Sequence, residues 1–195
     1  MKKWLVPGII VFLIIVVYFW AKGINNTAVI KDQASQEAWG NVQTSYQRRN
    51  DLIGNLVNTV KGAADFEKST LEAVIKARSE ATKTTIDPSN ITPEQLAEFN
   101  KAQSGVSSAL SRLLVTVEQY PVLRANQNFV KLQDELASTE NQILTARTRF
   151  NESVKDYNSH IQTFPNSIFA GMFGFKQKSY FNAVEGAEKP VEVKF

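Results

Sequence analysis

The sequence predicts an all-α protein, with an N-terminal transmembrane helix, an antiparallel up-and-down four-helix bundle and an irregular, aromatic-rich C-terminal tail. Its first 23 residues contain a long uncharged stretch, and the segments that follow repeat apolar residues every three or four positions. No alternation of apolar and polar residues between residues 30 and 163 is long enough to predict a sheet. A chain of 195 residues with 43% hydrophobic content can bury one core, so we expect a single folded domain.

Residues 1–23 are expected to form the membrane anchor. The 18 residues from Trp4 to Ala21 carry no charge, and aromatic residues stand at both ends, where the lipid headgroups would lie. A cleaved signal peptide is the alternative, with Ala21 and Gly23 as the small residues before the cut. Bulky Trp20 disfavours that reading.

Charge predicts the orientation of this anchor. Lys2 and Lys3 precede the span and outweigh Lys22 behind it, so the N-terminus is expected in the cytoplasm. The span would then be a single pass through the membrane, and the bundle would lie outside.

Residues 24–163 are expected to form the bundle, with its first two helices over 30–61 and 64–85. The first helix has one buried seam: Trp39, Val42, Tyr46, Arg49, Ile53, Leu56 and Val60. This spacing fails after Val60, and Gly62 stands at the failure, so we expect a break there.

The third and fourth helices are expected over 93–120 and 126–163. Thr92, Pro93 and Gln95 form a capping box with proline at the first helical position, and Pro121 ends the third helix. The third seam is Leu96, Phe99, Gln103, Val106, Leu110, Leu113, Val117 and Tyr120. The fourth is Leu132, Leu136, Glu140, Ile143, Arg147, Phe150, Val154, Tyr157 and Ile161.

Three charged residues occupy these apolar seams. If the first and fourth helices are antiparallel neighbours, Arg49 lies level with the stretch between Glu140 and Arg147, because each helix rises about 1.5 Å per residue. We therefore predict a structural polar layer in which Arg49 pairs with Glu140 and Arg147 completes the set. The alternative is that all three sit at the edge of the seam with their charged ends in water.

Three blocks resemble the LemA family of bacterial membrane-anchored proteins: "WGNVQTSYQRRNDLIGNLVNTVKG", "YPVLRANQNFVKLQDELASTENQI" and "YNSHIQTFPNSIFAGMFGFKQKSYF". The resemblance covers roughly residues 26–195. It implies an N-terminal anchor and an antiparallel four-helix bundle of the bromodomain-like type. It implies no enzyme activity, and links the chain to envelope maintenance and the organisation of membrane structures.

No catalytic, cofactor-binding or metal-binding residues are predicted. The chain lacks cysteine and has one histidine, His160, which pairs on a helix face only with Asp156, whereas a bundle metal pair needs several inward glutamates and two Glu-x-x-His motifs. Phosphate-binding loops, nucleophile elbows and zinc-protease motifs are absent from the sequence. The 22 basic residues include Lys2 and Lys3, which precede the membrane span; the remaining 20 stand against 19 acidic residues, and this near-neutral balance argues against nucleic-acid binding.

Residues 164–195 form the tail, which the four-helix topology delivers to the membrane end of the bundle. We predict that Phe169, Met172, Phe173 and Phe175 contact lipid or a membrane partner, with Lys176 and Lys178 near headgroups. The alternative is that these aromatic residues fold back and seal the base of the bundle. The last residues, "EKPVEVKF", are expected to be disordered, although their alternation could add a strand to a partner.

Two functions remain open on these observations. The first is a non-enzymatic scaffold at the cell envelope, which would bind the bilayer through Trp4–Ala21 and an envelope protein through its helices and tail. The second is an envelope sensor whose bundle responds to a ligand or stress.

Overall fold

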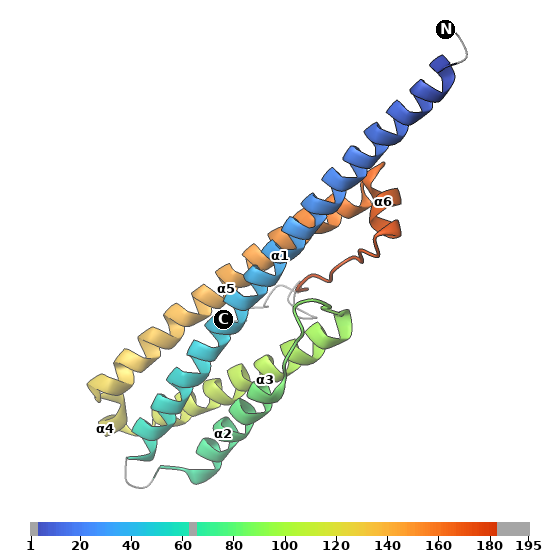
Figure 1. Cartoon of the computed structure of the whole chain (residues 1–195). Coiled ribbons are helices and arrows are strands. Elements are labelled where there is room, and N and C mark those ends of the chain that lie inside the picture. Colours follow the sequence, from blue (N-terminus) through green and yellow to red (C-terminus); the bar gives the residue numbers. More distant parts are fainter. Residues whose placement is uncertain (1–3, 63–65, 183–195) are drawn as a thin grey trace, which may run out of the picture.

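The structure is a computed structural model that describes residues 4–62 and 66–182 (Figure 1). Within these residues the chain is all-α, with no strand. Its six helices are α1 (Leu5–Lys61), α2 (Lys68–Lys83), α3 (Pro93–Val117), α4 (Pro121–Arg124), α5 (Gln127–Gln162) and α6 (Asn166–Met172). The expected disorder or strand of "EKPVEVKF" lies outside the described residues.

The first helix differs from the prediction, because the anchor and the first bundle helix are one continuous helix of 57 residues. A separate helix starting near residue 30 is therefore wrong. Gly23 costs a helix interior about 1 kcal/mol, but no proline stands between the two parts. Ile24 and Ala28, 4% and 0% exposed, are buried, and this packing offsets the weak propensity.

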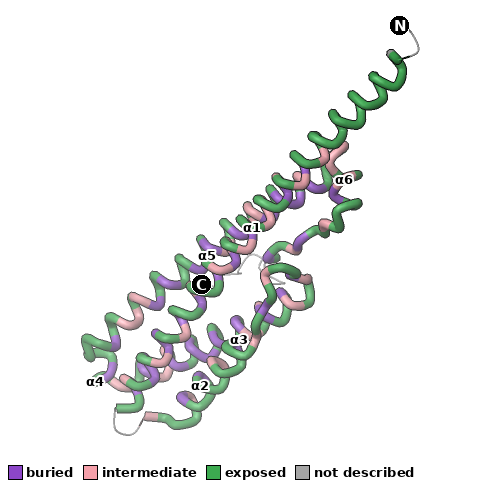
Figure 2. The backbone as a smooth tube through the Cα atoms, viewed as in Figure 1, coloured by how far each residue is buried: buried purple, intermediate pink, exposed green. Residues whose placement is uncertain are grey.

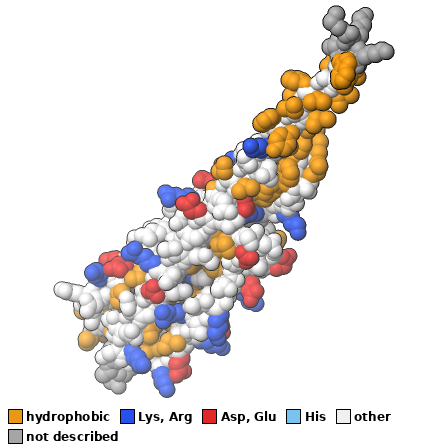
Figure 3. All heavy atoms as spheres, in the orientation of Figure 1, with side chains coloured by type: hydrophobic (Ala, Val, Ile, Leu, Met, Phe, Trp, Pro, Cys, Tyr) orange, Lys and Arg blue, Asp and Glu red, His pale blue; other side chains and the backbone are white. Residues whose placement is uncertain are grey.

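The N-terminal part of α1 projects beyond the other helices (Figure 1), and its residues are exposed (Figure 2). Within the described residues, α1 is the one helix long and apolar enough to cross a membrane, by length and composition. Hydrophobic side chains cover this end of the molecule in the space-filling view (Figure 3), whereas charged residues are scattered over the rest.

The long helices α1 and α5 pack side by side in opposite directions, and α2 and α3 form a hairpin against the half of α1 farthest from its N-terminus (Figure 1). The second helix, α2, begins at Lys68 rather than near residue 64, and it ends at Lys83, two residues before the predicted end. Gly62 does follow the end of α1, as expected.

The predicted capping box begins α3. Gln95 N–H donates to Thr92 Oγ1 at 3.3 Å, and Thr92 N–H donates back to Gln95 Oε1 at 3.0 Å. The helix ends at Val117, three residues earlier than predicted, and Pro121 starts the one-turn helix α4. Asn126 then caps α5 by accepting from the backbone of Asn128 and Phe129.

The core forms three clusters along the α1–α5 pair. The largest lies between α1, α2, α3 and α5, and the second surrounds Trp39, which is fully buried. A third, formed by Ala28, Tyr157, Ile161 and Ala170, joins α1 and α5 to α6. The tail thus begins with a short packed helix where the sequence predicted irregular structure.

Candidate functional site

Arg49 is the buried centre of a polar layer across three helices. Its guanidinium is 2% exposed, and Nη1 lies 3.0 Å from Glu140 Oε1 on α5 and 3.5 Å from Ser107 Oγ on α3. Nη2 donates to Gln103 Oε1, and Nε has no hydrogen-bond partner. The arginine therefore links α1 to both α3 and α5.

Glu140 gives this layer an open side. Its side chain is 49% exposed and lines a cavity of about 350 Å³ between α3 and α5. Since one end of the ion pair is buried and the other faces solvent, the layer is asymmetric.

Arg147 lies in a neighbouring cluster instead of joining Arg49 and Glu140 directly. Its Nη2 is 3.4 Å from Asn100 Oδ1, and its guanidinium carbon sits 4.4 Å above the Phe181 ring. Tyr46 connects the two clusters, because the Arg49 guanidinium lies 4.9 Å from the centre of its ring and the positive charges of Arg49 and Arg147 both act on its phenol.

The Tyr46 phenol reflects these surroundings. Burial raises its pKa above the ordinary value, while the positive charges of Arg147 and Arg49 oppose the increase. The neutral phenol is therefore the stable form in the core near neutral pH.

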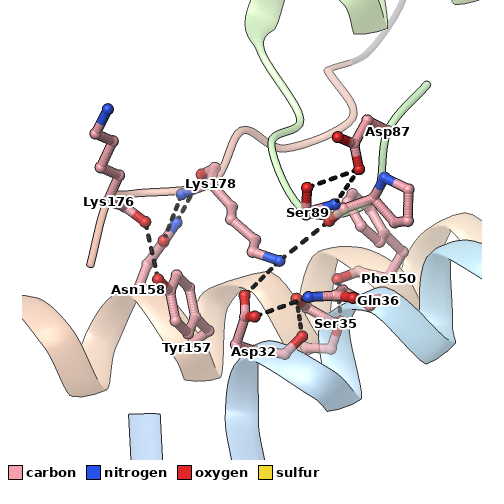
Figure 4. Close-up of polar contacts among 12 residues, drawn as sticks. Asp32, Ser35, Gln36, Asp87, Ser89, Phe150, Tyr157, Asn158, Lys176 and Lys178 are labelled. Atoms are coloured by element: carbon pink, nitrogen blue, oxygen red, sulfur yellow. Dashed lines mark hydrogen bonds and ion pairs between the residues drawn. The ribbon is translucent and has the colours of Figure 1, made fainter. Parts of the chain in front are cut away.

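The tail carries a second polar cluster, centred on Lys178 (Figure 4). The lysine side chain is 5% exposed. The prediction that it lies near lipid headgroups is therefore wrong. Its ammonium lies 2.6 Å from Asp32 Oδ1 on α1 and 3.3 Å from the Pro88 carbonyl in the α2–α3 loop. Gln36 donates to the other Asp32 oxygen at 2.8 Å, so both carboxylate oxygens are bound.

Two asparagines of α5 hold the backbone of the tail. Asn158 accepts from Lys178 N–H at 2.9 Å and donates to its carbonyl at 2.8 Å (Figure 4). Asn151 makes the same pair of contacts with Phe181, at 2.9 and 3.0 Å. Each side chain supplies the donor and acceptor that a strand would receive in a sheet. These hydrogen bonds hold the tail against α5 at Lys178 and at Phe181.

Tyr157 lies beneath this segment, and its hydroxyl donates to the Lys176 carbonyl at 3.0 Å. Burial raises the pKa of Tyr157, and the negative charge of Asp32 adds to the increase. A polar cavity of about 190 Å³ lies between this tyrosine, Asp32 and the tail.

Phe181 ends the described tail in the core. Its ring stacks on Trp39 at 5.5 Å and meets Phe150 and Phe99 at 5.5 and 6.4 Å. The tail thus contributes a buried aromatic residue to the cluster that joins α1, α3 and α5.

The predicted contact residues in α6 and just after it divide between partly buried and exposed positions. Phe169 is half-buried beside Trp20, with ring centres 6.1 Å apart, and Phe175 packs on the third core cluster. Met172 and Phe173 are 76% and 47% exposed, and Lys176 is also exposed. Only part of the predicted set can therefore meet another molecule.

His160 is engaged in structural contacts. Its Nε2 is 3.1 Å from the Ile24 carbonyl of α1, and Nδ1 is 3.3 Å from the Asn166 amide of α6. Across residues 4–62 and 66–182, no three His, Asp or Glu side chains gather as metal ligands would.

Sequence reasoning missed Asp32, Asn151 and Asn158 as partners of the tail, and it missed Phe181 as the tail residue that enters the core. One signal was present, since Asn151 and Asn158 stand seven residues apart and therefore on one helix face. Asp32 offered no such signal, because its partner is distant in the sequence.

A long apolar helix continuous with a packed helical body defines the class: an all-α protein with one N-terminal segment of membrane-spanning length. The LemA family matches residues 38–195, and the chain belongs to that family.

The chain is also similar to individual proteins, one of which is named LemA. The chain is 27% identical over 183 residues to magnetosome protein MamQ 2 of Paramagnetospirillum magneticum, a match covering 85% of this chain and 67% of the relative. Identity to magnetosome protein MamQ of Magnetospirillum gryphiswaldense is also 27%, with the same coverage. Protein LemA of Metamycoplasma hominis is 25% identical over 168 residues, covering 86% of this chain and 73% of that protein.

Proposed function

We propose that this LemA protein is a non-enzymatic scaffold that is anchored in the inner membrane of a bacterium and binds a partner at the envelope. Trp4–Ala21 would span the bilayer, with the N-terminus in the cytoplasm and the helical body outside. The observation that carries the proposal is the continuity of α1, which joins the apolar segment to the packed helices without a hinge. A rigid connection holds a binding surface at a fixed place relative to the membrane.

We also propose that α1, α2, α3 and α5 constitute an up-and-down four-helix bundle of the bromodomain-like type. The antiparallel packing of α1 with α5 and of α2 with α3 supports this description. Bundles of this kind present long helix faces to partners, which suits a scaffold.

The α6 surface is the proposed contact with the membrane or a membrane partner. We define it as the exposed apolar residues Phe164, Ile168, Met172 and Phe173. The contact between Phe169 and Trp20 places α6 beside the end of the apolar segment of α1. Exposed apolar groups next to a membrane span are suited to the headgroup region or to another membrane protein.

The relatives support a role in a larger assembly. Two are named as proteins of the magnetosome, a structure to which their own names assign them. We extend to this chain only the general idea of a protein that helps to organise a cellular structure.

Depth-dependent fluorescence quenching tests the membrane contact. The chain has no cysteine, so Met172→Cys introduces a single labelling site in the full protein, reconstituted in nanodiscs with spin-labelled lipid. We expect strong quenching at position 172 and none at the control Ser79→Cys, an exposed residue on α2. Equal signals at the two positions would reject the lipid contact.

Crosslinking in native membranes tests the scaffold itself. We expect one recurrent protein neighbour, whose yield falls when Met172 and Phe173 are both changed to Ser. Ile75→Ser removes an exposed apolar residue from α2 and serves as the matched control. The absence of any recurrent neighbour from membranes containing intact protein would reject the scaffold.

An envelope sensor is the second candidate, and the continuity of α1 favours it too, because an unbroken helix can transmit a tilt of the bundle into the membrane. A sensor requires a ligand that changes the bundle. A small molecule that shifts the thermal unfolding of the purified full chain, without a recurrent protein neighbour in membranes, would favour this candidate over the scaffold.

A further inference from the structure

The described part of the tail runs along α5 toward the N-terminal end of that helix. Lys178 is bound by Asn158, and Phe181, three residues later, is bound by Asn151. Seven helical residues rise about 10 Å, and three extended residues span the same length. The tail is therefore extended and antiparallel to α5 up to Phe181.

Phe181 enters the space between α3 and α5. Its ring contacts Phe99 of α3 and Phe150 of α5, and Arg147 covers it from the next turn of α5. Arg147 in turn binds Asn100 of α3. The described tail thus ends between α3 and α5, at the level of Phe99 and Phe150.

An apolar groove continues along the same gap. We call it the α3–α5 groove, with a volume of about 350 Å³ and walls that include Leu110 and Leu114 from α3 and Leu136 and Ala137 from α5. Ser107 and Glu140 line its near end, which the Arg49 polar layer closes from beneath. Nothing in the described residues fills it.

We infer that the α3–α5 groove is a docking site for the C-terminal segment of the same chain, residues 183–195. The segment continues directly from Phe181 and carries alternating Val191, Val193 and Phe195, which would present one apolar face. The family match extends through residue 195, so the segment is part of the family's domain.

Chain length agrees with this occupant. Leu136 lies 15 positions before Asn151, or about 22 Å along α5. The 12 residues from Phe181 to Val193 span about 19 Å as a coil and about 40 Å when extended, which brackets that distance. Attachment to the bundle also gives the segment an effective concentration near the millimolar range, so even a weak apolar contact would be populated.

Photocrosslinking tests the proposal on the full chain in nanodiscs. Phe195 is replaced by p-benzoylphenylalanine, and adducts are mapped by mass spectrometry. We expect adducts within the same chain on residues 107–114 of α3 and 133–140 of α5. Adducts confined to other residues, or none, would overturn the inference, as would crosslinks between two chains, which would identify a second copy as the occupant.

A matched pair of substitutions tests the groove. Ala137→Arg places a charge in the α3–α5 groove. Ser138→Arg places the same charge at the adjacent position, which lines a different cavity, between α1 and α5. Both residues are exposed, so both variants should fold. We expect Ala137→Arg to reduce groove adducts about tenfold and Ser138→Arg to leave them unchanged. Equal yields in the two variants would contradict docking in the groove.

Discussion

Arg49 and Glu140 form an ion pair whose two ends have very different environments: their N–O distance is 3.0 Å, but Arg49 is 2% exposed and Glu140 is 49% exposed. Removing the glutamate leaves a buried guanidinium without a counter-charge, whereas removing the arginine leaves a carboxylate that water can solvate. The glutamate thus stabilises a charge that the fold has already buried.

The first prediction concerns this asymmetry. Glu140→Ala is expected to lower the free energy of unfolding by about 3 kcal/mol, at the low end for a broken buried pair because one partner is half exposed. Urea unfolding of the full chain in detergent measures the loss. Glu135→Ala on the same helix breaks an outer pair with Lys131, at 3.9 Å, and should cost less than about 1 kcal/mol. Similar losses in the two variants would show that burial of Arg49 does not govern the energetics.

The second prediction concerns the tail. Asp32→Asn removes the negative charge that faces Lys178, so the buried ammonium loses its partner and the tail should detach. Hydrogen exchange at residues 176–182 should rise at least about tenfold, which corresponds to 1.4 kcal/mol of lost protection. The exposed Glu37→Gln on α1 removes the same charge without this contact and should leave the exchange unchanged. A protected tail in Asp32→Asn would contradict the role assigned to the ion pair.

The third prediction concerns two glycines inside helices. A Cβ at Gly54 would lie 3.2 Å from the Arg78 guanidinium, whereas one at Gly105 would meet nothing within 4 Å. Gly105→Ala should therefore stabilise the protein by about 0.5–1 kcal/mol through helix propensity. Gly54→Ala should gain less, because Arg78 must first move aside. Chemical unfolding of both variants measures the difference, and a larger gain at position 54 would contradict the close approach.

The fourth prediction concerns alkaline pH. The pKa of Tyr157 is raised in the folded protein, so its contribution to stability is complete below the unfolded pKa of about 10 and is lost as pH rises through the higher folded value. Tyr157→Phe should therefore flatten the decline in unfolding free energy above about pH 10. Because both proteins share every other titrating group, the difference between their curves isolates Tyr157. Parallel curves would show that the phenol has the same pKa in both states.

Much of the helical architecture follows from local sequence. Every residue predicted for the seam of the first helix is buried, including Arg49, because three-four spacing repeats one face of a helix. The Thr92 capping box is likewise local and was predictable. The start of α1 was not, since Gly23 and the polar residues after it suggest a boundary that packing of Ile24 and Ala28 overrides.

Side-chain environments set by tertiary contacts were harder to predict. Glu140 lies on the apolar stripe of α5 and yet is half exposed, because that part of the stripe faces the α3–α5 groove. Lys178 was expected near lipid from its position beside aromatic residues, but Asp32 and the Pro88 carbonyl hold it inside. Such pairings depend on which segments the fold brings together, and local sequence does not specify them.

The unbroken α1 also fixes how far the helical body extends from the membrane surface. With Trp4–Ala21 in a bilayer, the helix from Ala21 to Lys61 would rise about 60 Å at 1.5 Å per residue. The C-terminal end of α1 would then stand that far from the lipid when the helix is upright, while α6 stays at the surface. One molecule would thus contact the membrane through α6 and hold the C-terminal end of α1 at a fixed distance from it, where that end can contact another structure of the envelope.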